Sequence, residues 1–170
     1  CQALGIVPIV EPEVLMDGDH DINRCAEVTE QVLHEVFHAL SRHAVSLEGM
    51  ILKPNMVLAG KECSSRASAE EVAERTLSVL RRTVPAAVPS INFLSGGMGP
   101  EEATENLNAI NRQGISPWQL SISYGRALQQ PVLQAWGGKN ENRSAAQAAL
   151  LKRARLNSLA RSGQYQRDME

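Results

Sequence analysis

Cysteine is scarce in this sequence of 170 residues, which contains only Cys1, Cys25 and Cys63. Three is an odd number, and the spacings between these cysteines match neither a zinc ribbon nor a Cys-x-x-Cys redox motif. Those two classes of site are therefore excluded. We expect the chain to work in a reducing compartment, with the cytoplasm as the default.

Long apolar runs and an excess of positive charge are also missing. No apolar segment approaches the roughly 18 to 20 residues that cross a membrane, and the N-terminus lacks the basic-then-apolar pattern of a signal peptide. The 17 basic and 19 acidic residues give a formal net charge of −2, so no overall positive field draws the chain to nucleic acid or to an anionic membrane. We therefore expect a cytoplasmic protein without nucleic-acid or membrane partners, in which any anion site is local.

Apolar side chains are present in the amount that a core requires. The 43% hydrophobic and 21% charged residues are ordinary for one globular domain, and we find no low-complexity segment or interdomain linker. The chain starts at Cys1 without a methionine and enters the apolar segment GIVPIVEPEV almost at once. We therefore expect this chain to be a piece of something longer.

Strand patterns alternate with helical patterns along the chain. The strand patterns cover residues 4–14, 46–57, 88–97 and 117–125, and a helical pattern follows each of them. The first helix is predicted over about 22–44, and the second is predicted to be capped by Ser68, with Glu71 three residues on at the spacing of a capping box. A basic amphipathic helix over about 142–163 ends the chain. Such alternation predicts an α/β fold with four parallel strand–helix units, right-handed crossovers and a C-terminal helix.

One short stretch, HEVFH at residues 34–38, matches the His-Glu-x-x-His signature of zinc proteases. On a helical wheel of about 100° per residue, the less polar side chains gather on one side, at Ile22, Cys25, Ala26, Thr29, Val32, Leu33, Val36, Phe37 and Leu40. His34 and His38 fall nearly opposite, on the polar face with Glu27 and Gln31. We interpret this stretch as a solvated helix face. A zinc hydrolase that uses His34 and His38 is the alternative.

Charged side chains follow the first two predicted strands, at the ends where open α/β and barrel proteins build their sites. Glu11 and Glu13 continue the period-two pattern of the first strand, so both carboxylates share one face. A salt bridge at the rim is the alternative for this pair. Lys53 projects from the end of the second strand toward the interior, where burial favours the neutral, nucleophilic amine. The alternative is a rim lysine that reaches water.

Glycines follow the other two strands. Ser95, Gly96 and Gly97 close the third strand, where glycine lets backbone N–H groups approach a phosphate closely. The next helix begins with two acids, so the loop amides rather than that helix end would hold the anion. Gly125 and Arg126 follow the fourth strand and place a guanidinium beside free N–H groups. These two strand ends match the phosphate site of a (β/α)8 barrel, and two ordinary glycine turns are the alternative.

A lysine amine, neighbouring carboxylates and a phosphate cradle suggest Schiff-base chemistry on a phosphorylated carbonyl compound. The segments that carry these residues resemble class I fructose-1,6-bisphosphate aldolase. They are VPIVEPE, LEGMILKPNM, FLSGG, NLNAIN, SYGRALQ and AWGGKNEN, in the order of the family. The resemblance extends over nearly the whole chain and implies one partial TIM-barrel domain at 1–170, the second half of the barrel, with the N-terminal half absent from this chain.

The resemblance also implies a role for each candidate residue. Lys53 would be the Schiff-base lysine, Glu11 the general acid and base for carbinolamine dehydration, and Glu13 the group that holds and polarises the lysine. The residues implied for the C1 phosphate pocket are Ser95, Gly96, Gly97, Gly125 and Arg126. No cofactor or metal is implied, because the imine does what zinc does in class II aldolases.

The implied activity is the reversible cleavage of fructose 1,6-bisphosphate to dihydroxyacetone phosphate and glyceraldehyde 3-phosphate, in glycolysis and gluconeogenesis, by a cytoplasmic homotetramer. The family's other catalytic groups, an aspartate and two lysines on earlier strands, have no counterpart here, so we expect this chain alone to be inactive. Four strands leave two open edges and a one-sided core, and should not close a barrel. The final SGQYQRDME lacks the long tail and terminal tyrosine of the animal and plant enzymes. A non-catalytic half-barrel assembly module is the alternative function.

Overall fold

The computed structural model describes residues 1–170 and contains one parallel sheet with the strand order β1-β2-β3-β4. The strands are β1 (Ile9–Val10), β2 (Ile51–Leu52), β3 (Ser90–Phe93) and β4 (Gln119–Ile122). The helices are α1 (Ile22–Arg42), α2 (Ala69–Thr83), α3 (Pro100–Arg112), α4 (Arg126–Trp136) and α5 (Arg143–Arg161). The short 3₁₀ turns are η1 (Gln2–Leu4), η2 (Leu47–Gly49), η3 (Asn140–Asn142) and η4 (Arg167–Met169). The predicted α/β fold of four parallel strand–helix units and a C-terminal helix is confirmed.

The first two strands are shorter than their apolar patterns predicted, at two residues each. Proline, which has no N–H to donate to a neighbouring strand, stands directly before β1 at Pro8 and shortly after β2 at Pro54. The backbone remains extended beyond the regular strands, since the N–H of Lys53 donates to the carbonyl of Val10 at 2.8 Å. The pattern therefore located both strands correctly but overestimated how long they remain regular.

Side-chain caps fix where the first two helices begin. The carboxylate of Asp21 accepts from the N–H of Arg24 at 2.8 Å and starts α1. The hydroxyl of Ser68 accepts from the N–H of Glu71 at 3.2 Å and starts α2, as its position before the helical pattern predicted. These caps set the lengths of the loops that return the chain from each strand end to the helix layer.

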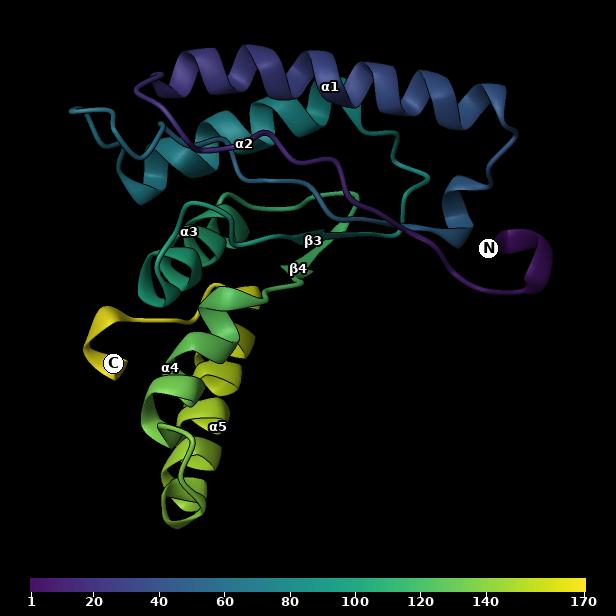
Figure 1. Ribbon diagram of the computed structural model, residues 1–170. Helices are drawn as coiled ribbons and strands as arrows, with labels where there is room; N and C mark the ends of the chain where they lie inside the picture. Colours follow the sequence, from purple (N-terminus) through teal and green to yellow (C-terminus); the bar gives the residue numbers. More distant parts are fainter.

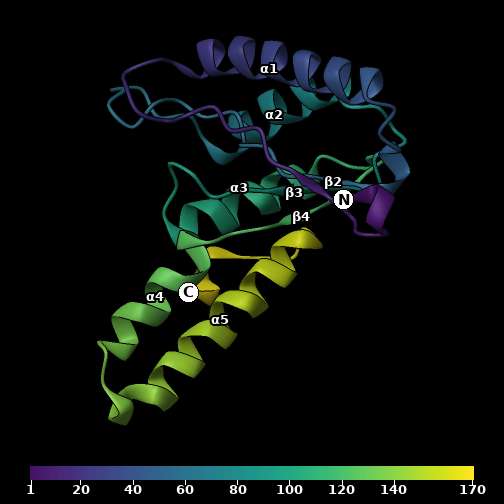
Figure 2. The same ribbon diagram turned by 45° about the vertical axis from the view of Figure 1, so that its right-hand side comes forward.

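The helices cover one face of the sheet as a continuous layer. Contacts run from α1 to α2, from α2 to α3 and from α3 to α5, and Figures 1 and 2 show these helices following one another around the strands. On the covered side of the sheet, the buried side chains are Leu52, Ile91, Phe93 and Leu120. The positions that alternate with them are only partly buried or exposed, at Ile9, Ile51, Ser90 and Gln119. The core is therefore one-sided, as predicted.

The sheet does not close on itself, because β1 and β4 are its two edges and neither pairs with a further strand. The open sheet face, defined as the side of Ile9, Ile51, Ser90 and Gln119, has only exposed or partly buried side chains at these positions. This arrangement is that of half a barrel, with a helix layer outside and an uncovered inner face.

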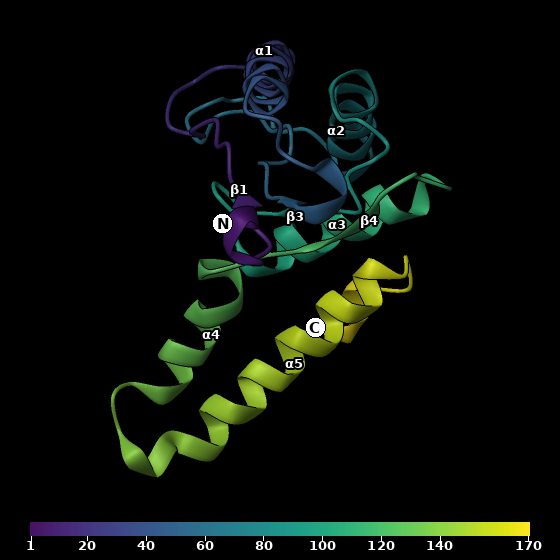
Figure 3. The same ribbon diagram turned by 90° about the vertical axis from the view of Figure 1, so that its right-hand side faces the viewer.

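The last two helices form a hairpin that extends away from the sheet. Helices α4 and α5 pack against each other, and η3 joins them at the tip that is farthest from the strands (Figure 3). The C-terminal part of α5 returns to the body of the fold and packs on α3. None of the helices is both long enough and apolar enough to cross a membrane.

Candidate active site

Lys53 and Glu11 meet at the C-terminal ends of β2 and β1. The Nζ atom of Lys53 lies 2.8 Å from Oε1 of Glu11, since both residues directly follow the paired positions Val10 and Leu52. Side chains alternate along a strand, so Lys53 shares the open sheet face with Ile51. The Lys53 side chain is 19% exposed and that of Glu11 is 47% exposed. The amine is thus largely shielded, while its carboxylate partner reaches solvent.

Glu13 has a different neighbour. No ion pair within 4.0 Å joins it to Lys53, whereas a Cβ atom added to Gly96 would lie 2.6 Å from Oε1 of Glu13. The structure therefore gives different neighbours to the two carboxylates that the period-two pattern placed on one face. Glu13 lies beyond the last paired residue of β1, where the strand alternation that the prediction used no longer applies. The contact with Lys53 that the family resemblance implied for Glu13 is absent.

The loop after β3 closely approaches the segments that follow β1 and β4. Gly97 has φ +84°, and a Cβ atom there would lie 2.6 Å from Cγ of Met16, so glycine is required for conformation and for space. Ser95 is buried, and its hydroxyl accepts a hydrogen bond from the N–H of Ala127 at 3.5 Å. This bond joins the loop of Ser95, Gly96 and Gly97 to the first turn of α4.

The start of α4 is open to solvent. Gly125 is its N-cap residue and has no side chain with which to cap the helix, and a Cβ atom on Gly125 would meet nothing within 4 Å. The first N–H groups of a helix have no acceptor within the helix and carry partial positive charge. Arg126 follows in the first turn and is exposed. Since Leu128 and Gln129 donate to the carbonyl of Gly125, the N–H groups without a partner are those of Gly125 and Arg126. Together with the exposed Arg126 side chain, they suit an anion.

Asn55 and Tyr124 hold these loops in place, and sequence reasoning identified neither of them. Asn55 is buried; its Oδ1 accepts from the N–H of Val14 at 3.0 Å and its Nδ2 donates to Thr29 at 3.1 Å. The hydroxyl of Tyr124 donates to the carbonyl of Ala103 at 2.8 Å, and burial raises the pKa of this phenol. The one available signal was an asparagine inside the buried segment after Lys53, since a buried amide needs partners.

The HEVFH stretch lies on α1, away from the strand ends. His34 and His38 are both exposed, whereas every side chain assigned to the less polar face by the wheel is buried or partly buried, so the predicted orientation of this helix is confirmed. The chain contains no group of three or more histidine, cysteine, aspartate or glutamate side chains that is arranged to hold a metal ion.

The four strand ends thus supply an amine with a carboxylate at 2.8 Å and, beside them, a glycine loop joined to an open helix start. An amine can attack a carbonyl, a carboxylate at hydrogen-bond distance can move the protons of that reaction, and the loops can hold an anionic group of the same molecule. The C-terminal end of the sheet therefore carries one group of candidate residues, which are Lys53, Glu11, Ser95, Gly96, Gly97, Gly125 and Arg126. Glu13 lies between the two parts of this group.

Comparisons with known proteins show which family this chain resembles. The family described as Glycolytic, fructose-bisphosphate aldolase class-I, matches residues 1–170. Fructose-bisphosphate aldolase B of Gallus gallus is 59% identical over 166 residues, which cover 97% of this chain and 46% of that protein. The cytosolic fructose-bisphosphate aldolase 4 of Arabidopsis thaliana is 57% identical over 171 residues, which cover 100% of this chain and 44% of that protein.

A solved structure is similarly close. The fructose-bisphosphate aldolase from Plasmodium falciparum, crystallised with TRAP and a small-molecule inhibitor, superimposes with a TM-score of 0.96 and 54% identity. The match covers 98% of this chain and 48% of that one. The chain therefore spans about half the length of the relatives that it matches.

Proposed function

Because the chain belongs to the class I fructose-bisphosphate aldolase family, we propose that it is the catalytic half of a Schiff-base aldolase. Together with a complementary half-barrel, it reversibly cleaves fructose 1,6-bisphosphate to dihydroxyacetone phosphate and glyceraldehyde 3-phosphate. The observation that carries this proposal is the contact of 2.8 Å between the shielded amine of Lys53 and the carboxylate of Glu11 on the open sheet face.

In the proposed reaction, Lys53 becomes the covalent partner of the substrate. Glu11 accepts a proton from the ammonium of Lys53, and the neutral amine attacks the ketone carbon to form a carbinolamine. Glu11 returns the proton to the carbinolamine hydroxyl, which leaves as water and gives a protonated imine. The imine then accepts the electrons of the C3–C4 bond as the C4 hydroxyl gives its proton to the Glu11 carboxylate, so the aldehyde departs and an enamine remains on Lys53. No metal or cofactor is required for these steps.

The phosphate on C1 of the substrate is assigned to the two glycine-containing loops. The Ser95 hydroxyl and the N–H groups of Gly96, Gly97 and Gly125 are the proposed donors, with Arg126 as the charge partner. Glu13 lies next to Gly96, and its carboxylate would repel a dianion placed there. The proposed pocket therefore needs Glu13 to turn away from Gly96 when phosphate binds, in the direction of the role at Lys53 that the family resemblance implies.

The uncovered half of the fold supports a complementary half-barrel as the partner. Large apolar side chains are exposed along the segment that contains β1, at Leu4, Ile6, Val7, Ile9 and Leu15, and the edges of β1 and β4 are unpaired. Such a surface is costly in water and is suited to strands that continue the sheet. We propose that the partner is the first four strands of the same barrel, on the same polypeptide or on a separate chain. The chain combined with those strands is called the completed barrel below.

The finer assignments follow from the same family. We propose a cytoplasmic homotetramer acting in glycolysis and gluconeogenesis, with residues 1–170 as the second half of one TIM-barrel domain. The cytosolic relative from Arabidopsis thaliana supports this location. A non-catalytic half-barrel assembly module would bind its partner through the same exposed edge. The chemistry of Lys53 is therefore what distinguishes the aldolase from the assembly module.

Trapping of the imine tests this function. Borohydride added to the completed barrel with dihydroxyacetone phosphate should reduce the imine to a stable secondary amine on Lys53, located by peptide mass spectrometry. The Lys53→Met variant should acquire no adduct. An adduct on another residue, or none in a protein that cleaves fructose 1,6-bisphosphate, would reject Lys53 as the nucleophile.

A further inference from the structure

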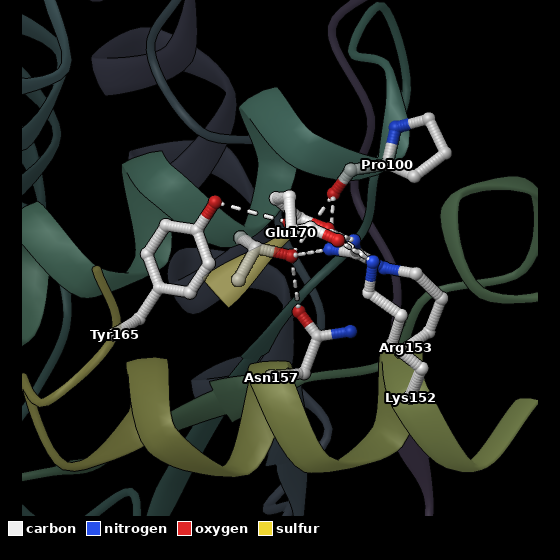
Figure 4. Close-up of polar contacts among 7 residues, drawn as sticks. Pro100, Lys152, Arg153, Asn157, Tyr165 and Glu170 are labelled. Carbon is white, nitrogen blue, oxygen red and sulfur yellow. Dashed lines mark hydrogen bonds and ion pairs between the residues drawn. The ribbon is translucent and has the colours of Figure 1, made fainter. Parts of the chain in front are cut away.

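A buried ion pair joins the C-terminal segment to the helix layer (Figure 4). The Nη1 atom of Arg153, on α5, lies 2.7 and 2.6 Å from the two carboxylate oxygens of Glu170. These side chains are 5% and 15% exposed. The hydroxyl of Tyr165 donates to the same carboxylate at 3.0 Å, and Nζ of Lys152 lies 3.8 Å from it. Glu170 is therefore held by donors from two sides rather than by a single surface contact.

The same guanidinium reaches the first turn of α3. The Nη2 atom of Arg153 donates to the carbonyl of Pro100 at 3.1 Å and also to the hydroxyl of Thr104. The Thr104 hydroxyl lies 2.9 Å from Oδ1 of Asn157 on α5. Pro100 is the first residue of α3 and directly follows the phosphate loop, defined here as residues 95–99. Arg153 thus bonds simultaneously to the C-terminal segment and to the helix that ends the phosphate loop.

The other candidate phosphate-binding segment is attached to the same turn of α3. Tyr124, which directly precedes Gly125 and Arg126, donates to the carbonyl of Ala103 at 2.8 Å. The first turn of α3 therefore fixes both segments of the proposed phosphate pocket. Residues 95–99 are attached to it by the peptide bond to Pro100, and residues 125–126 are attached to it by Tyr124.

Arg153 depends on Glu170 for its position. An unpaired guanidinium in the protein interior is strongly disfavoured, and Glu170 is the only acidic side chain that pairs with it. The Nε atom of Arg153 has no hydrogen-bond partner, and neither has the Nδ2 atom of Asn157. Without the carboxylate, the guanidinium would recover favourable hydration by turning toward water, and it would then lose its hydrogen bond to the carbonyl of Pro100.

We propose that Arg153 is a positioning residue for the phosphate loop, that Glu170 holds it in place, and that residues 164–170 are thereby coupled to the affinity for phosphate-bearing ligands. This inference rests on the proposed function of residues 95–99 and Arg126. Arg153 acts through Pro100 and α3, and it takes no part in the chemistry at Lys53.

The experiment compares two ketones that differ only in the phosphate. Borohydride trapping on Lys53 is measured in the completed barrel against the concentration of dihydroxyacetone phosphate and, separately, of dihydroxyacetone. Glu170→Gln, which removes the charge and keeps the shape, should raise the half-saturating concentration of the phosphorylated ketone by about 3- to 30-fold, the usual range for coupled sites. The value for dihydroxyacetone should not change.

Glu141→Gln is the matched control, because it makes the same change of charge at an exposed ion pair with Lys139 that involves neither Arg153 nor α3, and it should leave both values unchanged. Glu170→Asp, which retains the charge on a shorter side chain, should give a smaller change in the same direction and serves where Glu170→Gln does not fold. Equal changes for both ketones, or no change for either, would overturn the inference. An unaltered protein that traps neither ketone on Lys53 would instead contradict the proposed function itself.

Discussion

The Nζ atom of Lys53 and Oε1 of Glu11 form an ion pair at 2.8 Å, across the neighbouring ends of β1 and β2. Glu13, only two residues further along the chain, lies instead against Gly96 in the loop after β3. One short acidic segment therefore supplies a carboxylate to the amine and another to the proposed phosphate pocket. The two glutamates have different surroundings, and their substitution should have different effects.

The first prediction concerns proton transfer at Lys53. Glu11→Gln keeps a hydrogen-bonding group beside the amine but cannot move protons, so kcat of the completed barrel should fall by about 10²- to 10⁴-fold. Glu13→Gln should lower kcat less and should lower the KM for fructose 1,6-bisphosphate, because it removes a negative charge next to Gly96. Steady-state kinetics of both variants checks this. A larger loss of kcat in Glu13→Gln than in Glu11→Gln would exchange the roles assigned to the two residues.

The second prediction concerns the phosphate pocket. Arg126→Ala should weaken the binding of ligands that carry a C1 phosphate by roughly 1.5 to 3 kcal/mol, the range for hydrogen bonds to charged groups. Arg126→Lys should recover only part of this, since an ammonium cannot hold two phosphate oxygens as a planar guanidinium does. Titration calorimetry with dihydroxyacetone phosphate gives the affinities. Arg143→Ala, at the exposed start of α5, is the control, and an unchanged affinity in Arg126→Ala would remove Arg126 from the site.

The third prediction concerns stability at alkaline pH. Burial and the hydrogen bond to Glu170 raise the pKa of Tyr165 to about 12, whereas a tyrosine in the unfolded chain ionises near pH 10. Below pH 10 both states hold the proton. Between about pH 10 and 12 only the unfolded state loses it, so the free energy of unfolding should fall as the pH rises. In urea unfolding, Tyr165→Phe should show a shallower fall over this range, and an equally steep fall would contradict the assignment.

Much of the fold followed from the sequence because local patterns determined it. The alternation of strand and helix patterns identified the parallel sheet, Ser68 marked the start of α2, and the glycine before Arg126 marked the start of α4. The prolines around the first two strands were visible too, but their effect on strand length depends on which N–H groups face a neighbour. A pattern of apolar residues does not contain that information.

The different neighbours of Glu11 and Glu13 and the burial of Arg153 were beyond sequence reasoning. Period two holds only while the backbone stays in a regular strand, and β1 ends at Val10, so the direction of Glu13 is set by the loop of another strand. In a basic amphipathic helix, Arg153 has the appearance of one more solvated cation. Its burial arises from Thr104 and Glu170, which are 49 and 17 residues away in the chain, and no local signal points to such contacts.

The last prediction concerns the HEVFH stretch. Replacing both His34 and His38 with glutamine should leave aldol cleavage by the completed barrel and its metal content unchanged, and chelators should not inhibit the unaltered completed barrel. Both side chains are exposed on α1, whereas the candidate site lies at the ends of the strands. Exposed substitutions of this kind usually shift stability by no more than about 0.5 kcal/mol, so a folding defect should not obscure the result. Elemental analysis that finds one zinc per chain, lost together with activity in the double variant, would overturn both the interpretation of this helix and the metal-free mechanism at Lys53.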